Sequence, residues 1–122
     1  ERKYLEPGIR QEALDLAQRG LNLAPKYIDL IDTRGMAYYR MGRFTDAIRD
    51  FTDCIKLYPQ ETASVTAVHF HLARAFAKVQ DVDNALQNLN KAMSLNDKLG
   101  GLSPGDLAEA KQLLEQLSKE GG

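Results

Sequence analysis

The sequence lacks several features that define particular classes of protein. It contains a single cysteine, Cys54, so no disulfide bond can form within the chain, and cysteine usage does not indicate a redox compartment. No apolar run approaches the roughly 18 to 20 residues that a membrane-spanning helix needs. The 16 Lys and Arg residues nearly balance the 17 Asp and Glu residues, and they are scattered rather than gathered in a basic stripe. This pattern argues against membrane insertion and against a nucleic-acid-binding surface.

Patterns typical of catalysis and of metal binding are also missing. His69 and His71 stand two apart on a predicted helix, about 200° around its axis, so they cannot bind one ion together. We expect His69 to be packed and hydrogen-bonded in the core and Cys54 to fill a small-residue core position. No Cys, His and Asp cluster has ligand spacing, and no Gly-rich phosphate loop follows a strand. The sequence therefore predicts no enzyme activity, no catalytic residue, no metal and no cofactor.

The chain does contain a sequence pattern, called here a phrase, that occurs three times. It reads QEALDLAQRGLNLAP, TDAIRDFTDCIKLYP and DNALQNLNKAMSLND, with Ala13, Ala47 and Ala85 at equivalent positions. The first two alanines are 34 residues apart, and the last two are 38 residues apart. In each phrase an apolar residue follows the alanine by four positions, and a small residue comes three positions later. Offsets of four and seven place all three side chains on one helix face.

A second stripe precedes the last two phrases. Its members lie at i, i+4 and i+7 around a small central residue: Ile31, Gly35 and Tyr38, and then His69, Ala73 and Phe76. Small central residues let two helices approach closely while the large flanking side chains interlock. Between the stripes lie the breaks MGRFTD and VQDVDN, where we expect Gly42 to end one helix and Thr45 or Asp83 to cap the next. Each unit is therefore predicted to be a helical hairpin.

This pattern resembles the tetratricopeptide repeat, a 34-residue helix–turn–helix unit. The resemblance rests on IDTRGMAYYRMGRFTDAIRDFTDCIKLYP, in which the matching residues are Gly35, Tyr38, Ala47, Phe51 and Pro59. Ile31 and Arg34 stand where the family usually has Trp and Leu. The resemblance implies an all-α domain of helical hairpins stacked in a right-handed superhelix and closed by a C-terminal capping helix.

The expected organisation is a single domain, residues 1–122, that is a fragment of a longer protein. It comprises a partial repeat at 1–27, repeats at 28–61 and 62–99, and a capping helix at 103–119. We expect a helix in ERKYLEPG to stop at Pro7 and Gly8, and the last helix to be capped by Ser103 with Pro104 in its first position. Four extra residues in QETASV predict a helix that starts one turn early, near Glu61 to Ser64.

The family resemblance also implies where a ligand would bind. In this fold the first helix of each pair lines a concave groove. The groove face therefore consists of those residues of the first helix that do not belong to its core stripe. The predicted groove residues are Asp32, Met36, Tyr39, Arg40, Phe70, His71, Arg74 and Lys78. Exposed aromatic and Met side chains framed by charge often mark binding surfaces, although they can also cover the seams between hairpins. Asp29 and Asp32 complement the helix dipole in any case.

The leading hypothesis is a protein-interaction module that holds a peptide or a partner helix in this groove. Some members of the family grip the C-terminal carboxylate of heat-shock chaperones with Lys, Arg and Asn, and the acidic Asp29 and Asp32 argue against that ligand here. The alternative is self-association, or packing within a larger chain, near Tyr4, Leu5, Ile9 and Leu16. We expect a protein or peptide partner, no nucleic acid and no membrane insertion. A soluble, cytoplasmic location is favoured, although the sequence does not fix the compartment.

Overall fold

The computed structural model describes residues 2–121, with side chains for residues 11–120, and all of its regular secondary structure is helical. The helices are α1 (Arg2–Leu23), α2 (Ile28–Arg40), α3 (Phe44–Leu57), α4 (Ala63–Lys78), α5 (Val82–Leu99) and α6 (Pro104–Gly121). They form two compact units, the first ending at Leu57 and the second beginning at Tyr58. In the described part of the chain, no helix combines the length and the apolar character that a membrane span requires.

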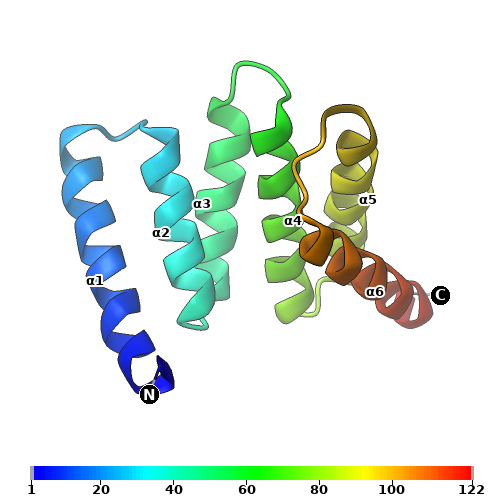
Figure 1. Cartoon of the computed structure of the whole chain (residues 1–122), viewed down its shortest axis with the longest axis horizontal. Coiled ribbons are helices and arrows are strands. Elements are labelled where there is room, and N and C mark those ends of the chain that lie inside the picture. Colours follow the sequence, from blue (N-terminus) through cyan, green and yellow to red (C-terminus); the bar gives the residue numbers. More distant parts are fainter. Residues whose placement is uncertain (1, 122) are drawn as a thin grey trace. The chain divides into compact units, whose positions relative to one another are not determined.

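In the first unit, α1, α2 and α3 run alternately up and down, and each packs on the next (Figure 1). The buried side of α1 consists of Leu14, Ala17 and Leu21, which recur at helical spacing. Gly20 lies against the Leu30 side chain of α2, closely enough that a Cβ at this position would collide with it. The helical-hairpin prediction is therefore confirmed for α2 and α3, and α1 adds a third layer.

The closest approach of α2 to α3 is at Gly35. A Cβ built on this glycine would lie 2.7 Å from the Phe51 ring and 3.2 Å from the Cβ atom of Asp50. Phe51 cannot retreat easily, because it and Ala47 are fully buried. The small centre that the sequence pattern predicted is thus a steric requirement of the helix crossing.

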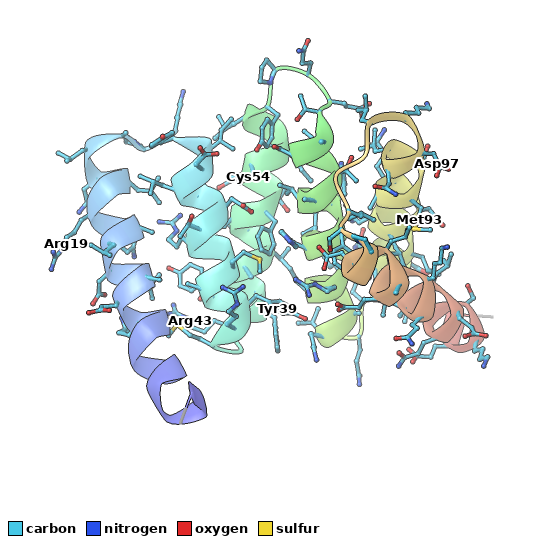
Figure 2. All side chains as sticks on the ribbon, viewed as in Figure 1. Arg19, Tyr39, Arg43, Cys54, Met93 and Asp97 are labelled. Atoms are coloured by element: carbon cyan, nitrogen blue, oxygen red, sulfur yellow. The ribbon has the colours of Figure 1, made fainter. Side chains whose placement is uncertain are left out.

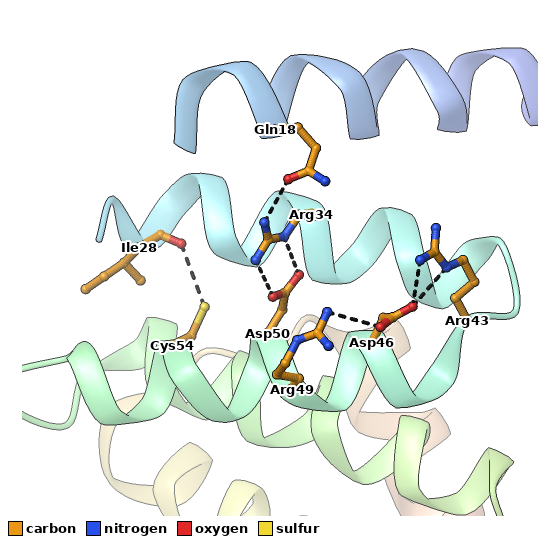
Figure 3. A network of polar contacts seen from close by, with 8 residues as sticks. All are labelled: Gln18, Ile28, Arg34, Arg43, Asp46, Arg49, Asp50 and Cys54. Atoms are coloured by element: carbon orange, nitrogen blue, oxygen red, sulfur yellow. Dashed lines mark hydrogen bonds and ion pairs between the residues drawn. The ribbon is translucent and has the colours of Figure 1, made fainter. Parts of the chain in front are cut away.

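A buried ion pair lies beside this crossing (Figure 3). The Arg34 guanidinium donates from Nε to Oδ2 of Asp50 at 2.8 Å and from Nη2 to Oδ1 at 2.7 Å, which is bidentate geometry. Its remaining nitrogen, Nη1, donates to Oε1 of Gln18 on α1 at 2.9 Å. Asp50 is fully buried, and its hydrogen bonds raise the pKa of Arg34 above the ordinary value. The network joins α1, α2 and α3, and its Asp50 and Gln18 ends were not predicted from the sequence.

The second unit has its own core between α4, α5 and α6. Its fully buried residues are Phe70, Ala73, Ala85, Leu89, Ala92 and Ala110, and Leu117 is 3% exposed. Ala73 and Ala85 repeat the small centres of the first unit, while Ala110 and Leu117 bring the C-terminal helix onto the same cluster. The helix predicted as a cap therefore supplies part of the core of this unit.

The turns and caps follow the predictions in part. Gly42 has a φ of +80°, which confirms the left-handed position after α2, and Gln80 adopts φ +61° at the equivalent place after α4. The prediction that Thr45 or Asp83 caps a helix is wrong, because both lie inside helices that begin before them. Asp81 caps α5 instead, since its carboxylate accepts the backbone N–H of Asn84 at 3.3 Å.

Two further predictions about helix ends are confirmed and one is wrong. The Ser103 hydroxyl accepts the backbone N–H of Asp106 at 3.1 Å, and α6 begins at Pro104. Helix α4 begins at Ala63, within the range predicted from the four inserted residues. The expected break at Pro7 and Gly8 does not occur, because the backbone of α1 continues through both positions; proline removes one N–H donor there without ending the helix.

Substitution of Gly35 by Ala should destabilise the chain by about 1 to 3 kcal/mol, because the new methyl group overpacks the contact with Phe51. Gly105→Ala is the matched control, since its Cβ meets nothing closer than 4.0 Å in α6. Better helix propensity should make that control neutral or more stable by up to about 1 kcal/mol. Urea denaturation of both variants gives the comparison, and equal effects at the two glycines would contradict the proposed crossing.

Replacing Asp50 alone by Leu should cost about 3 to 5 kcal/mol, because it leaves the Arg34 charge without its buried partner. The double variant Arg34→Met, Asp50→Leu should recover much of that loss, since no charge then remains in the interface. The free energies of unfolding of wild type, both single variants and the double variant form a complete cycle. Strictly additive effects would show that the pair is not coupled.

Candidate functional site

On α2, the four predicted groove residues lie outside the tightly packed side of the helix. Asp32, Met36 and Tyr39 are partly exposed and Arg40 is exposed. Tyr38 is 5% exposed, so one of the two adjacent tyrosine rings enters the core and the other remains at the surface, as predicted. The Tyr39 ring, labelled in Figure 2, meets Phe44 edge to face with centroids 5.4 Å apart. This contact fixes Tyr39 at the end of the α2–α3 hairpin.

On α4, the predicted exposure of Phe70 is wrong. Phe70 is fully buried in the cluster that includes Ala110 and Leu117 of α6. The sequence placed it on the free face of α4, but that part of the face packs against the C-terminal helix. Phe70 therefore supports neighbouring side chains and is not available as a direct contact for a ligand.

Arg74 lies directly over the buried ring. Its Cζ atom is 4.8 Å from the centroid of Phe70, a cation–π geometry that confirms the predicted proximity of the two side chains. The Arg74 side chain is 18% exposed, and its Nη1 lies 3.4 Å from Oε2 of Glu109 on α6. The sequence analysis did not connect Glu109 with Arg74. No local signal could have done so, because the two residues are 35 positions apart.

The remaining predicted residues of α4 form a basic strip with Arg74. His71 and Arg74 are partly exposed, and Lys78 is exposed at the last residue of the helix. Their spacing of three and then four residues places all three on one face. A strip of imidazole, guanidinium and ammonium groups offers hydrogen-bond donors that suit carboxylates.

A separate, open hollow of about 560 Å³ lies along α4 and α5. It is lined by His69, Gln87, Asn88, Asn90 and Lys91. His69 is hydrogen-bonded as predicted, with its Nδ1 3.0 Å from Oδ1 of Asn88, and partial burial lowers its pKa. Its predicted place in the core is wrong, because the side chain is only partly buried and borders this hollow. Lys91 is paired with Glu61 at 2.8 Å, a hydrogen bond that lowers the pKa of this carboxyl. This hollow therefore presents amides and an already paired ammonium group.

Cys54 is a core residue, as the sequence pattern predicted. Its side chain is fully buried, and Sγ donates to the carbonyl oxygen of Ile28 at 3.7 Å (Figure 3). Burial raises the pKa of the thiol to about 12, with nearby carboxylates adding to the shift. The thiolate needed for nucleophilic chemistry is thus disfavoured at neutral pH. Among the described residues, no group of three or more His, Cys, Asp and Glu side chains could hold a metal ion.

Phe70→Ala should cost about 3 to 5 kcal/mol of stability, as expected for truncating a fully buried aromatic side chain. His71→Ala, at the next position and partly exposed, should cost less than about 1 kcal/mol. Thermal denaturation followed by circular dichroism compares the two variants. If Phe70→Ala melted like wild type, Phe70 would have to be a surface residue.

Known proteins resemble this chain in sequence and in structure, among them the following three. A mitochondrial import receptor subunit, TOM70 of Rattus norvegicus, is 29% identical over 91 residues, a match that covers 74% of this chain and 13% of the receptor. The first repeat domain of Spaghetti (RPAP3), bound to the HSP90 peptide SRMEEVD, superposes with a TM-score of 0.76 at 23% identity, covering 98% of this chain and 85% of that one. A domain of yeast Sti1 in a pHsp70 complex gives a TM-score of 0.78 at 19% identity, covering 98% and 90%.

The family assignment rests on the sequence itself. Tetratricopeptide repeat family models match residues 29–61 and residues 66–99, which together are more than half of the chain. The first matched segment contains all but the first residue of α2 and the whole of α3. The second contains all but the first turn of α4 and the whole of α5. The helical hairpins, their small centres and the two solved structures agree with this assignment. The chain belongs to the tetratricopeptide repeat family.

Proposed function

We propose that this chain is a non-catalytic protein-interaction module that binds a short acidic peptide, or an acidic helix, of another protein through the basic strip of α4. The strip consists of His71, Arg74 and Lys78. The observation that carries the proposal is the position of Arg74, whose guanidinium lies over the Phe70 ring while 18% of the side chain is exposed. A guanidinium held in this way loses less conformational entropy when it binds a carboxylate.

The predicted residues of α2 belong to the first unit. Met36 and Tyr39 are partly exposed there, and the Tyr39 ring also packs against Phe44 at the end of its own hairpin. Arg40 and Asp32 flank them with opposite charges. That all eight predicted residues form one groove remains a prediction. Within this set, Phe70 is a buried residue that supports the Arg74 side chain.

The two solved relatives suggest a suitable probe. The peptide SRMEEVD, bound by the Spaghetti domain, has three acidic side chains besides Met and Val. On α4 of this chain, the basic strip can pair with such acidic groups. We therefore use SRMEEVD as a test ligand for acidic peptides, without assigning a chaperone as the natural partner.

Arg74→Glu should weaken binding of fluorescent SRMEEVD by about 1 to 3 kcal/mol, the range of interface hot spots, with a larger effect at low salt. The matched control is Lys119→Glu, an exposed residue in the last turn of α6 that changes the net charge equally. Glu109→Gln should act in the opposite direction, because it removes the carboxylate that already occupies Arg74; a pair of this kind contributes up to about 1 kcal/mol.

Fluorescence anisotropy at two salt concentrations measures all four proteins. The ligand control is the peptide SRMQQVN, amidated at its C-terminus so that it carries no acidic group. The proposal requires saturable binding of the acidic peptide and weak or no binding of the peptide without acidic groups. Equal weakening by Arg74→Glu and Lys119→Glu would reduce the effect to net charge and would contradict the proposed site. Absence of binding by every variant would reject acidic peptides as ligands.

A further inference from the structure

Helix α1 has a second apolar surface besides the one that packs against α2. Leu16 and Leu23 are 62% and 89% exposed, although both are large hydrophobic residues. Because they are seven residues apart, they lie on one stripe of the helix. Arg19, on the edge of this stripe, projects away from α2 (Figure 2). The predicted self-association residues Tyr4, Leu5 and Ile9 lie outside the described side chains, whereas Leu16 is described and exposed.

The charged edge of this stripe is self-complementary. Glu12 precedes Leu16 by four residues, and Arg19 follows it by three; both are exposed. If two copies of α1 lay antiparallel across a two-fold axis at Leu16, Arg19 of each copy would face Glu12 of the other. The axial offset between the two charges would be about 1.5 Å, the rise of one helical residue, which long side chains easily bridge. A two-fold axis would produce this ion pair twice.

The opposite edge of the stripe consists of small residues. Ala13 and Gly20 are partly exposed, and Gly20 also lies against the Leu30 side chain of α2, so this edge borders the packing within the unit. In a parallel two-fold pair the charged edge of each helix would instead face the small-residue edge of the other copy, so this ion pair would not form. The charges therefore favour the antiparallel pair.

We propose that a second copy of this chain docks on α1, giving a symmetric antiparallel dimer centred on Leu16. The contact is independent of the peptide site on α4. A single pair of helices offers less surface than the roughly 1,200 to 2,000 Å² buried in stable interfaces. The dimer is accordingly weak and forms in a concentration-dependent manner.

A charge-swap experiment tests the arrangement. Sedimentation velocity over a wide range of protein concentrations gives the dimer dissociation constant of wild type, Glu12→Arg, Arg19→Glu and the double variant. Each single variant should raise the dissociation constant about tenfold or more, because it replaces two attractive pairs by two repulsive ones. The double variant should return to nearly the wild-type value. Leu16→Asp should abolish the dimer, and unchanged circular dichroism spectra would show that these exposed positions do not alter the fold.

Three outcomes overturn the proposal. Wild-type protein that stays monomeric at every concentration would exclude a second copy as the occupant of this face. A dimer that is insensitive to Leu16→Asp would place the contact elsewhere. Failure of the double variant to recover association would exclude the antiparallel register. Because no peptide is present, none of these results bears on the proposed peptide site.

Discussion

The close approach of paired helices at a small residue is the constraint on which each unit depends. At Gly35 the Phe51 ring occupies the space that a Cβ atom would need. Helix α2 can therefore pack this closely on α3 only when it is rotated about its own axis so that Gly35 faces Phe51. Ala73 and Ala85, both fully buried, take corresponding places in the second unit. Once the rotation of a helix is fixed, the division of its side chains between core and surface is fixed as well. The residues available for binding are therefore those that lie outside the helix–helix contacts.

Polar interactions are placed around these crossings without replacing them. Arg34, where the repeat family usually has Leu, reaches the fully buried carboxylate of Asp50 and also bonds to Gln18. Such a pair stabilises little relative to apolar packing, but a missing partner is costly, so it penalises any other register of the three helices. In the second unit, Arg74 lies over Phe70 and meets Glu109. The two pairs differ in their carboxylates, because Asp50 is fully buried whereas the Glu109 side chain is 49% exposed.

The sequence was sufficient where the information is local and periodic. The recurring alanines predicted the hairpins, Ser103 predicted the start of α6, and the four inserted residues predicted the early start of α4. It was insufficient where contacts join distant segments. Phe70 has the spacing of a surface residue on α4, but it is buried in one cluster with Ala110 and Leu117, which are 40 and 47 positions away. The α5 cap was missed by two residues, since Asp81 and Asp83 are chemically equivalent candidates and only the backbone geometry distinguishes them.

We propose that core packing leaves the basic strip of α4 to recognise acidic peptides. A nuclear magnetic resonance titration of the isotope-labelled chain with SRMEEVD, followed through the assigned backbone amides, tests this proposal. We expect saturable shift changes centred on His71, Arg74 and Lys78, with a smaller response at Glu109 as its contact with Arg74 is exchanged for the ligand. Changes concentrated instead around His69 and Lys91, in the hollow along α4 and α5, would show that the strip is not the binding site.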